Sequence, residues 1–236
     1  GTSWPDPRKW LEQALRVEGR DPAEVAKIVA RYGSSRRGQL VADLAAYDEA
    51  RRMFERLVMG GRKDLESDLA NLCQHAAVVH ETADDTSGAL ALHDRGIEIY
   101  KRLVNVEGRR DLADDLATHY QYKAVVVGRL GDNRAAVTLC DRAIEIREQL
   151  VTVEGRRDLA DGLAGLYMNK ANAVQNLGDN QAAVALYDRA IEIYERLVNL
   201  EGRRDLADDL ATLYLNKAIA VGALGDHRAA VALYDR

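Results

Sequence analysis

The segment EGRRDLAD occurs at residues 107–114, 154–161 and 201–208, so its three copies lie 47 residues apart. A diverged version, GGRKDLES, begins one period further upstream at Gly60. The match extends beyond this segment, because GALALHDRGIEIYKRLVNV ending at residue 106 aligns with AAVTLCDRAIEIREQLVTV one period later. A fixed period of this length predicts a solenoid in which each unit buries its apolar face against its neighbours.

Each unit is predicted to form two antiparallel helices. In the third copy, apolar residues recur at three- and four-residue steps from about 158 to 177 and again from about 180 to 199. Asp158 is the expected N-cap of the first helix, and Asp161 complements the helix dipole in its first turn. Gly178 is expected to end that helix in the left-handed conformation. So short a turn makes the two helices neighbours.

A 47-residue period lies in the range of HEAT and armadillo units, but the residue pattern resembles the tetratricopeptide repeat. That signature has small residues where paired helices touch, a Gly-Asp turn, and an aromatic residue between two alanines. The third copy has Ala171, Gly178–Asp179, Ala183, Tyr187 and Ala190, and the other copies keep most of these. The usual unit of the family has about 34 residues and commonly closes with Pro, whereas these units are longer and have Glu-Gly there.

The resemblance implies an all-α, right-handed superhelical solenoid of antiparallel helix pairs. It covers residues 60–236 well and 38–58 weakly. The expected array spans 38–236, with units near 60–106, 107–153, 154–200 and, incomplete, 201–236.

Residues 1–37 are expected to form a helical cap or a degenerate repeat. Helices are predicted from Pro5 to about Arg16 and from Asp21 to about Arg31, followed by a loop at 32–37. Because Arg236 falls inside a predicted helix and solenoids need a polar terminal cap, we expect the natural chain to continue.

Composition narrows the functional classes. The chain has 236 residues, 47% of them hydrophobic and 30% charged, with a net charge of −5. This acidic balance argues against nucleic-acid binding, and no apolar run reaches the roughly 18 residues of a membrane span. Two cysteines without a signal segment favour a reducing, cytoplasmic setting.

Copies within one chain can be compared residue by residue. Segments 154–189 and 201–236 differ at eight positions. On a helical wheel the six differences in the first helix share one arc, opposite unchanged apolar residues such as Leu163 and Tyr167. The unchanged arc is interpreted as the packing face, since identical neighbours require identical contacts.

By the resemblance, the first helix of each unit lines a concave surface where peptides or partner helices bind. The changing arc therefore predicts a partner-binding groove, in which amides can both donate to and accept from a peptide backbone. The alternative is a solvated face with no dedicated ligand. The side chains expected in the groove are Gln74, His75, Gln121, Tyr122, Arg129, Met168, Asn169, Asn172, Gln175, Asn176, Leu215 and Asn216.

Charged residues that recur in every copy are expected to be structural. Lys123, Lys170 and Lys217 are predicted to pack their stems between helices and to pair with a carboxylate such as Asp141 or Asp188, rather than to bind an anion. The Arg-Arg pairs that begin at Arg109, Arg156 and Arg203 are predicted to form salt bridges at the unit junctions, rather than to hold phosphate.

Cys73, His75, His80 and His93 raise the question of a metal site. Their spacing places neighbours on different helix faces, and Cys73 and His93, like Cys140, stand where other copies have Tyr. They are therefore interpreted as core substitutions, with no metal and no cofactor expected. No Gly-rich phosphate loop, nucleophile elbow or HExxH occurs, and no enzyme is predicted.

The predicted function is recognition: a scaffold that holds a protein segment or partner domain, as a sensor module of a larger bacterial signalling protein. Arrays of similar appearance accompany signalling ATPases or caspase-like proteases. The alternative is a self-assembling array whose near-identical copies stack end to end. A co-chaperone clamp is disfavoured because the groove lacks the required Lys and Arg set.

Overall fold

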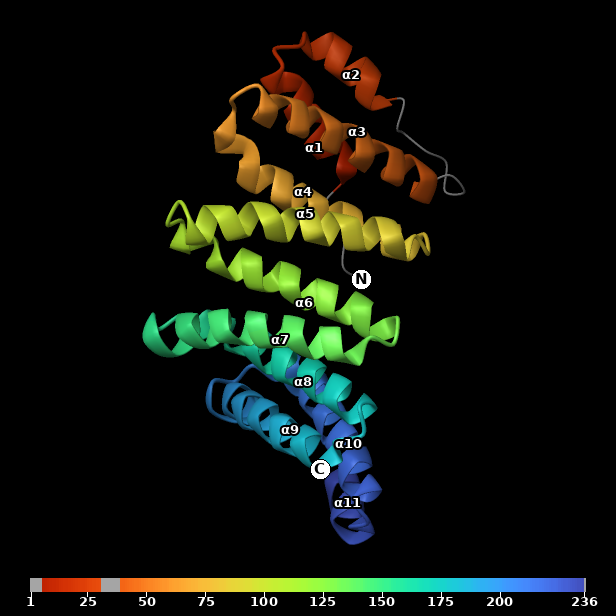
Figure 1. Ribbon diagram of the computed structural model, residues 1–236, viewed down its shortest axis with the longest axis vertical. Helices are drawn as coiled ribbons and strands as arrows, with labels where there is room; N and C mark the ends of the chain where they lie inside the picture. The colour runs from red at the N-terminus through yellow and green to blue at the C-terminus, as the bar shows by residue number, and fades with distance from the viewer. Residues whose placement is uncertain (1–5, 31–38, 236) are drawn as a thin grey trace. The chain divides into compact units, whose positions relative to one another are not determined.

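The computed structural model describes residues 6–30 and 39–235, and every regular element in these ranges is helical (Figure 1). This confirms the all-α class and the paired helices with their 47-residue period. The α-helices are α1 (Pro7–Val17), α2 (Pro22–Ala30), α3 (Gln39–Met59), α4 (Glu66–Thr82), α5 (Thr86–Asn105), α6 (Ala113–Arg129), α7 (Asn133–Glu148), α8 (Ala160–Asn176), α9 (Asn180–Glu195), α10 (Ala207–Ala223) and α11 (His227–Tyr234).

The chain divides into two compact units, Gly1–His119 and Tyr120–Arg236, and the division falls within α6. In the first unit α1 packs against α2 and α3, α3 against α4, and α4 against α5. In the second unit α8 packs against both α7 and α9, and α10 against both α9 and α11. The first helix of a pair is thus held on two sides by second helices.

The amino-terminal segment is helical where helices were expected. Helices α1 and α2 lie within two residues of the predicted bounds, while the loop predicted at 32–37 lies outside the described residues. The weak copy at 38–58 corresponds to the single helix α3. Trp10 of α1 meets Phe54 of α3 edge-on, with 5.9 Å between the ring centroids.

In the three later helix pairs the turn between the helices has the sequence Leu-Gly-Asp, whereas the α4–α5 turn has Ala83, Asp84 and Asp85. Gly178 has a φ of 91°, which a residue with a Cβ adopts only with strain. The carboxylate of Asp179 then accepts a hydrogen bond from the backbone N–H of Ala182 at 2.9 Å and caps α9. Asp132 and Asp226 cap α7 and α11 in the same way.

The expected N-cap at Asp158 is wrong, because α8 begins only at Ala160. Asp158 lies in a 3-10 turn, and its carboxylate accepts two hydrogen bonds from the Arg156 guanidinium, at 3.0 and 2.8 Å. These hydrogen bonds are the main cause that lowers the pKa of Asp158. A two-pronged guanidinium two residues away outcompetes a backbone N–H for this carboxylate.

The same Arg-Asp pair recurs at the other unit junctions, as Arg62–Asp64, Arg109–Asp111 and Arg203–Asp205. This confirms the predicted salt bridges for the first arginine of each Arg-Arg pair. Asp161 lies in the first turn of α8 as predicted. The second helix ends earlier than expected: α9 stops at Glu195 and continues as a π-helical turn, Arg196–Leu200.

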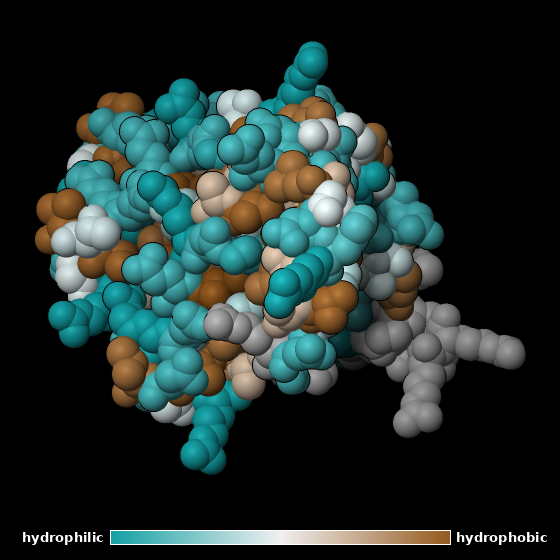
Figure 2. All heavy atoms as spheres, turned by 90° about the horizontal axis from the view of Figure 1, so that it is seen from below, coloured by the Kyte–Doolittle hydropathy of each residue, from teal (hydrophilic) through white to brown (hydrophobic). Residues whose placement is uncertain are grey.

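The packing face of α8 is buried as predicted at Leu163, Leu166, Tyr167 and Ala171. Leu177 is an exception, because it is the C-cap and lies where the chain already reverses, so it is 47% exposed. In Figure 2, apolar (brown) side chains are interspersed with polar (teal) ones on the face in view.

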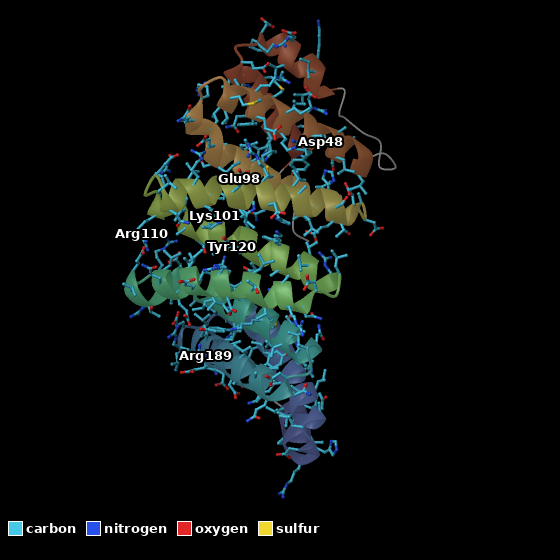
Figure 3. All side chains as sticks on the ribbon, viewed as in Figure 1. Asp48, Glu98, Lys101, Arg110, Tyr120 and Arg189 are labelled. Atoms are coloured by element: carbon cyan, nitrogen blue, oxygen red, sulfur yellow. The ribbon has the colours of Figure 1, made fainter. Side chains whose placement is uncertain are left out.

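Successive pairs in the second unit are joined by two polar contacts at equivalent positions. Lys170 Nζ on α8 lies 2.6 Å from Asp141 Oδ1 on α7, and the Tyr167 hydroxyl donates to Glu148. One period later, Lys217 pairs with Asp188 and the Tyr214 hydroxyl donates to Glu195. Arg189 of α9, labelled in Figure 3, also donates to Tyr167 Oη at 3.2 Å. This confirms the structural interpretation for Lys170 and Lys217.

At two positions, a residue that differs from its equivalents in the other copies meets a second such residue across the helix interface. His119 stands where the other copies have Leu, and it is fully buried. Gly96 stands where two other copies have Ala, and a Cβ there would lie only 2.1 Å from His119 Cε1. The imidazole therefore takes the space of the missing methyl group.

A second such pair lies between α7 and α8. Arg147 stands where other copies have Tyr, is 6% exposed, and donates to Gln121 Oε1 at 2.8 Å. Gly162 replaces the Asp of the other copies, and a Cβ there would lie 2.7 Å from Arg147 Nη1. The missing side chain makes room for the guanidinium.

Replacing Gly165 of α8 and Gly178 of the turn after it by alanine should change the free energy of unfolding in opposite directions. Gly178→Ala forces a Cβ into the left-handed region and should cost about 1–2 kcal/mol of unfolding free energy. Gly165→Ala adds a Cβ whose nearest neighbour lies 3.8 Å away and should gain about 0.5–1 kcal/mol. Urea denaturation measures both, and a fall in stability for Gly165→Ala would contradict this packing.

His119 should make the protein sensitive to acid. Burial, aided by His93, lowers the pKa of His119 to about 3, so the folded chain needs the neutral ring. The contribution of the neutral His119 ring to the free energy of unfolding is complete above pH 6.5. It is lost as the pH falls from 6.5 towards 3, by up to about 1.4 kcal/mol per pH unit. His119→Leu should flatten the decline of Tm between pH 7 and 4.5. An identical decline in both proteins would refute this role.

Candidate functional site

A cavity of about 280 Å³ opens in the second unit between α6 and α8, over α7. Helices α6 and α8 are the first helices of consecutive pairs, which is where the groove is predicted. We call this space the α6–α8 cavity. Its apolar lining is Ala124, Val125, Gly128, Ala136, Cys140 and Ala173, and its polar lining is Arg129, Asn133, Asn169, Asn172 and Asn176.

The cavity follows from the small side chain of Cys140. The two later copies have Tyr187 and Tyr234 at this position, and Tyr187 fills its site completely, with no exposed surface. Cys140 is just as deeply buried but occupies far less volume. Burial raises the pKa of its thiol to about 12, so the sulfur is protonated at neutral pH and is a poor nucleophile.

The amides Asn172 and Gln175 form hydrogen bonds with the tyrosine of their own helix pair. Tyr187 Oη lies 2.6 Å from Asn172 Oδ1 and 2.8 Å from Gln175 Oε1. A phenol has one proton, so it donates to one amide and can accept an N–H from the other. Gln175 thus has a structural role, whereas Asn172 both contacts Tyr187 and lines the α6–α8 cavity.

The preceding pairs differ at both ends of this contact. Val125 and Gly128 of α6 stand at the positions of Asn172 and Gln175, so this pair lacks both the tyrosine and its amide partners, whereas the last pair has Tyr234 together with Ile219 and Gly222. In the first unit, His93 and Glu81 replace tyrosine and glutamine, with 3.5 Å between His93 Nε2 and Glu81 Oε1. Val125 and Gly128 belong to the apolar part of the cavity wall on α6, which also carries Arg129.

Four of the predicted groove residues meet at the α6–α8 cavity: Arg129, Asn169, Asn172 and Asn176. Asn176 Nδ2 also donates to Asn133 Oδ1 at 3.3 Å, and the sequence comparison does not single out Asn133. Comparison of the copies places Cys140 in the core, as found, without revealing the cavity. The volume difference between Cys140 and Tyr187 is the signal that could have found it.

The other predicted groove residues have different surroundings. Gln121 accepts the hydrogen bond from buried Arg147. Tyr122 and Leu215 are exposed on α6 and α10, while Met168 and Asn216 are half-buried. In the first unit, Gln74 and His75 are half-buried on α4. His75 packs against Trp10, with 6.1 Å between the ring centroids, and its burial lowers its pKa.

The cysteines and histidines considered for a metal are dispersed. Cys73 and His93 are buried core residues, in agreement with their interpretation as substitutions. Within residues 6–30 and 39–235, no cluster of three or more His, Cys, Asp or Glu side chains has a metal-binding arrangement. Over the same residues, no helix combines the length and apolarity that crossing a membrane requires.

Residues 163–205, which span most of α8 and all of α9, match the family model of the tetratricopeptide repeat. The chain has a tetratricopeptide-like repeat fold. Among curated protein sequences, none matches this tetratricopeptide-like chain significantly.

Solved structures of low sequence identity share the fold. BtubC from P. vanneervenii has 19% identity and a TM-score of 0.70, covering 98% of this chain and 86% of its own. A point variant of the kinesin light chain repeats from Podosopora anserina has 15% identity and a TM-score of 0.65, covering 98% and 93%. MamA has 13% identity and a TM-score of 0.52, covering 81% and 86%. These tetratricopeptide-like neighbours establish the fold alone.

Tyr187→Phe should destabilise the chain by about 1–2 kcal/mol, because two half-buried amides lose their shared phenol. Tyr194→Phe is the matched control on the same helix. Tyr194 is also buried, and no hydrogen bond from its hydroxyl occurs among the described residues. Urea denaturation of both variants measures the difference, and equal stability of the two would show that the Tyr187 contact is worth nothing.

Proposed function

We propose that this chain is a recognition scaffold that binds an extended segment of a partner protein along α6, α8 and α10. Repeats of this kind are typically protein–protein interaction scaffolds. The observation that supports the proposal is the α6–α8 cavity, whose polar rim is formed by residues at positions where the copies differ.

The rim offers hydrogen-bonding capacity together with apolar surface. Asn169 lines the cavity and no protein hydrogen bond of its amide occurs among the described residues. An amide can pair with a peptide N–H and C=O at once. Tyr122 and Val125 on α6, and Leu215 and Ile219 on α10, are large apolar side chains exposed on the same first helices. Such a mixture of aromatic or aliphatic anchors and polar rim is typical of interfaces.

The scaffold is proposed to act in the cytoplasm, as the sensor module of a larger bacterial signalling protein. Its two cysteines are free and buried, which suits a reducing compartment. No catalytic step is assigned to the chain, since the thiol at the cavity is held protonated.

End-to-end self-association is the second candidate. It is supported by Val231 and Tyr234 on α11, which are 59% and 51% exposed, whereas the equivalent Tyr187 is fully buried. Light scattering against concentration tests it. A molar mass that stays constant from micromolar to millimolar protein would exclude self-assembly.

The scaffold proposal is tested with peptides selected from a random phage-displayed library against the full chain. Asn169→Ala combined with Asn216→Ala should weaken the selected peptides about tenfold, equivalent to about 1.4 kcal/mol. The Tm should be unchanged, because neither amide has a protein partner among the described hydrogen bonds.

Gln181→Ala is the control, an exposed amide on the second helix α9, and it should bind peptides as the wild type does. Failure to select any saturable peptide would contradict the scaffold proposal. A large fall in Tm for the double variant would show that these amides are structural.

A further inference from the structure

We infer that the α6–α8 cavity is a receptor for one aromatic side chain without a hydroxyl group, carried by a partner segment with a carboxylate beside it. This rests on the proposed function and names the chemistry of the partner. The occupant is a phenylalanine-type ring next to an acidic group.

The repeat itself shows what fills such a space. One period later the equivalent position is Tyr187, whose ring is completely enclosed by its own chain. At Cys140 the chain supplies no ring, and a volume of about 280 Å³ is left open between α6 and α8. An apolar cavity of about 150 Å³ suffices to hold a benzene molecule. The α6–α8 cavity can therefore hold a ring supplied from outside.

The wall on α6 selects against a hydroxyl. The phenol of Tyr187 is satisfied by Asn172 and Gln175. The equivalent residues on α6 are Val125 and Gly128, and neither side chain can donate or accept a hydrogen bond. A hydroxyl directed at Val125 and Gly128 would be buried without a partner there, which is costly, so a benzyl side chain fits this wall better than a phenol.

The rim selects for negative charge. The lining contains the guanidinium of Arg129 and the amides of Asn133, Asn169, Asn172 and Asn176, and it contains no carboxylate. Arg129 is the charged member of this lining. A guanidinium and amide N–H groups are the donors that a carboxylate prefers. An acidic group beside the ring is therefore complementary to the rim.

The probes are three small molecules of matched size: N-acetyl-L-phenylalanine, its neutral amide N-acetyl-L-phenylalaninamide, and N-acetyl-L-tyrosine. Binding to the full chain is followed by NMR chemical-shift titration at millimolar concentrations. N-acetyl-L-phenylalanine should bind saturably and at least fivefold more tightly than either of the others. Arg129→Gln should remove the preference for the acid over the amide while leaving the ring bound.

Two variants fill the cavity from opposite walls. Cys140→Phe supplies the missing ring from α7, and Gly128→Leu projects a side chain from α6, where a Cβ would meet only Ala136 Cβ at 3.6 Å. Both should abolish probe binding with a Tm at or above that of the wild type. Gly222→Leu, at the equivalent position of α10 with a similar 3.7 Å contact to Ala230 Cβ, should bind the probe as the wild type does.

No saturable binding of N-acetyl-L-phenylalanine to the wild type, or unchanged binding to a folded Cys140→Phe or Gly128→Leu variant, would overturn the inference. The library-selected peptides separate it from the scaffold proposal. If they bind Cys140→Phe with the wild-type Kd, the ring receptor fails and the scaffold stands. If no peptide binds the wild type, it is the scaffold proposal that has failed.

Discussion

The first helices α4, α8 and α10 each pack between two second helices, and this constraint governs the rest of the structure. Protein interiors are packed as densely as organic crystals, so a change of even one methylene group is felt. The near-identical copies satisfy the constraint with the same residues, and the Lys-Asp and Tyr-Glu contacts of the second unit recur one period apart. A departure in one copy therefore either needs an adjustment in its neighbour or leaves space.

Two departures show that adjustment. His119 is accommodated by Gly96 and Arg147 by Gly162, in each case because the small partner has lost the side chain that would collide. The amides Asn172 and Gln175 of α8 contact Tyr187, although the last copy has Tyr234 without equivalent amides. Cys140 differs because, among the residues that line the cavity, no larger side chain fills the space that a tyrosine ring occupies one copy later. The space that remains is where a partner can contribute a side chain, and this links the packing constraint to recognition.

The fold was predictable because its signal is periodic. The repeat length, the helix pairs, the Gly-Asp turn and the pairing of Lys170 with Asp141 all follow from comparing copies. A helical wheel reports which face a residue occupies but not which side chain it meets across the interface. The wheel therefore predicts a groove position for Gln175 without showing its contact to Tyr187, and the N-cap prediction for Asp158 does not account for the Arg156 guanidinium. The helical wheel cannot reveal the α6–α8 cavity either, because the cavity depends on a volume that three helices enclose together.

The most direct test of this account is a double-mutant cycle on Gly96→Ala and His119→Leu, measured as the free energy of unfolding in urea. Together these changes restore the Ala and Leu found at the equivalent positions of other copies. Compensation predicts that Gly96→Ala alone is strongly destabilising, that the double variant recovers most of the loss, and that the coupling reaches about 1–3 kcal/mol. Additive effects, with no recovery in the double variant, would contradict it.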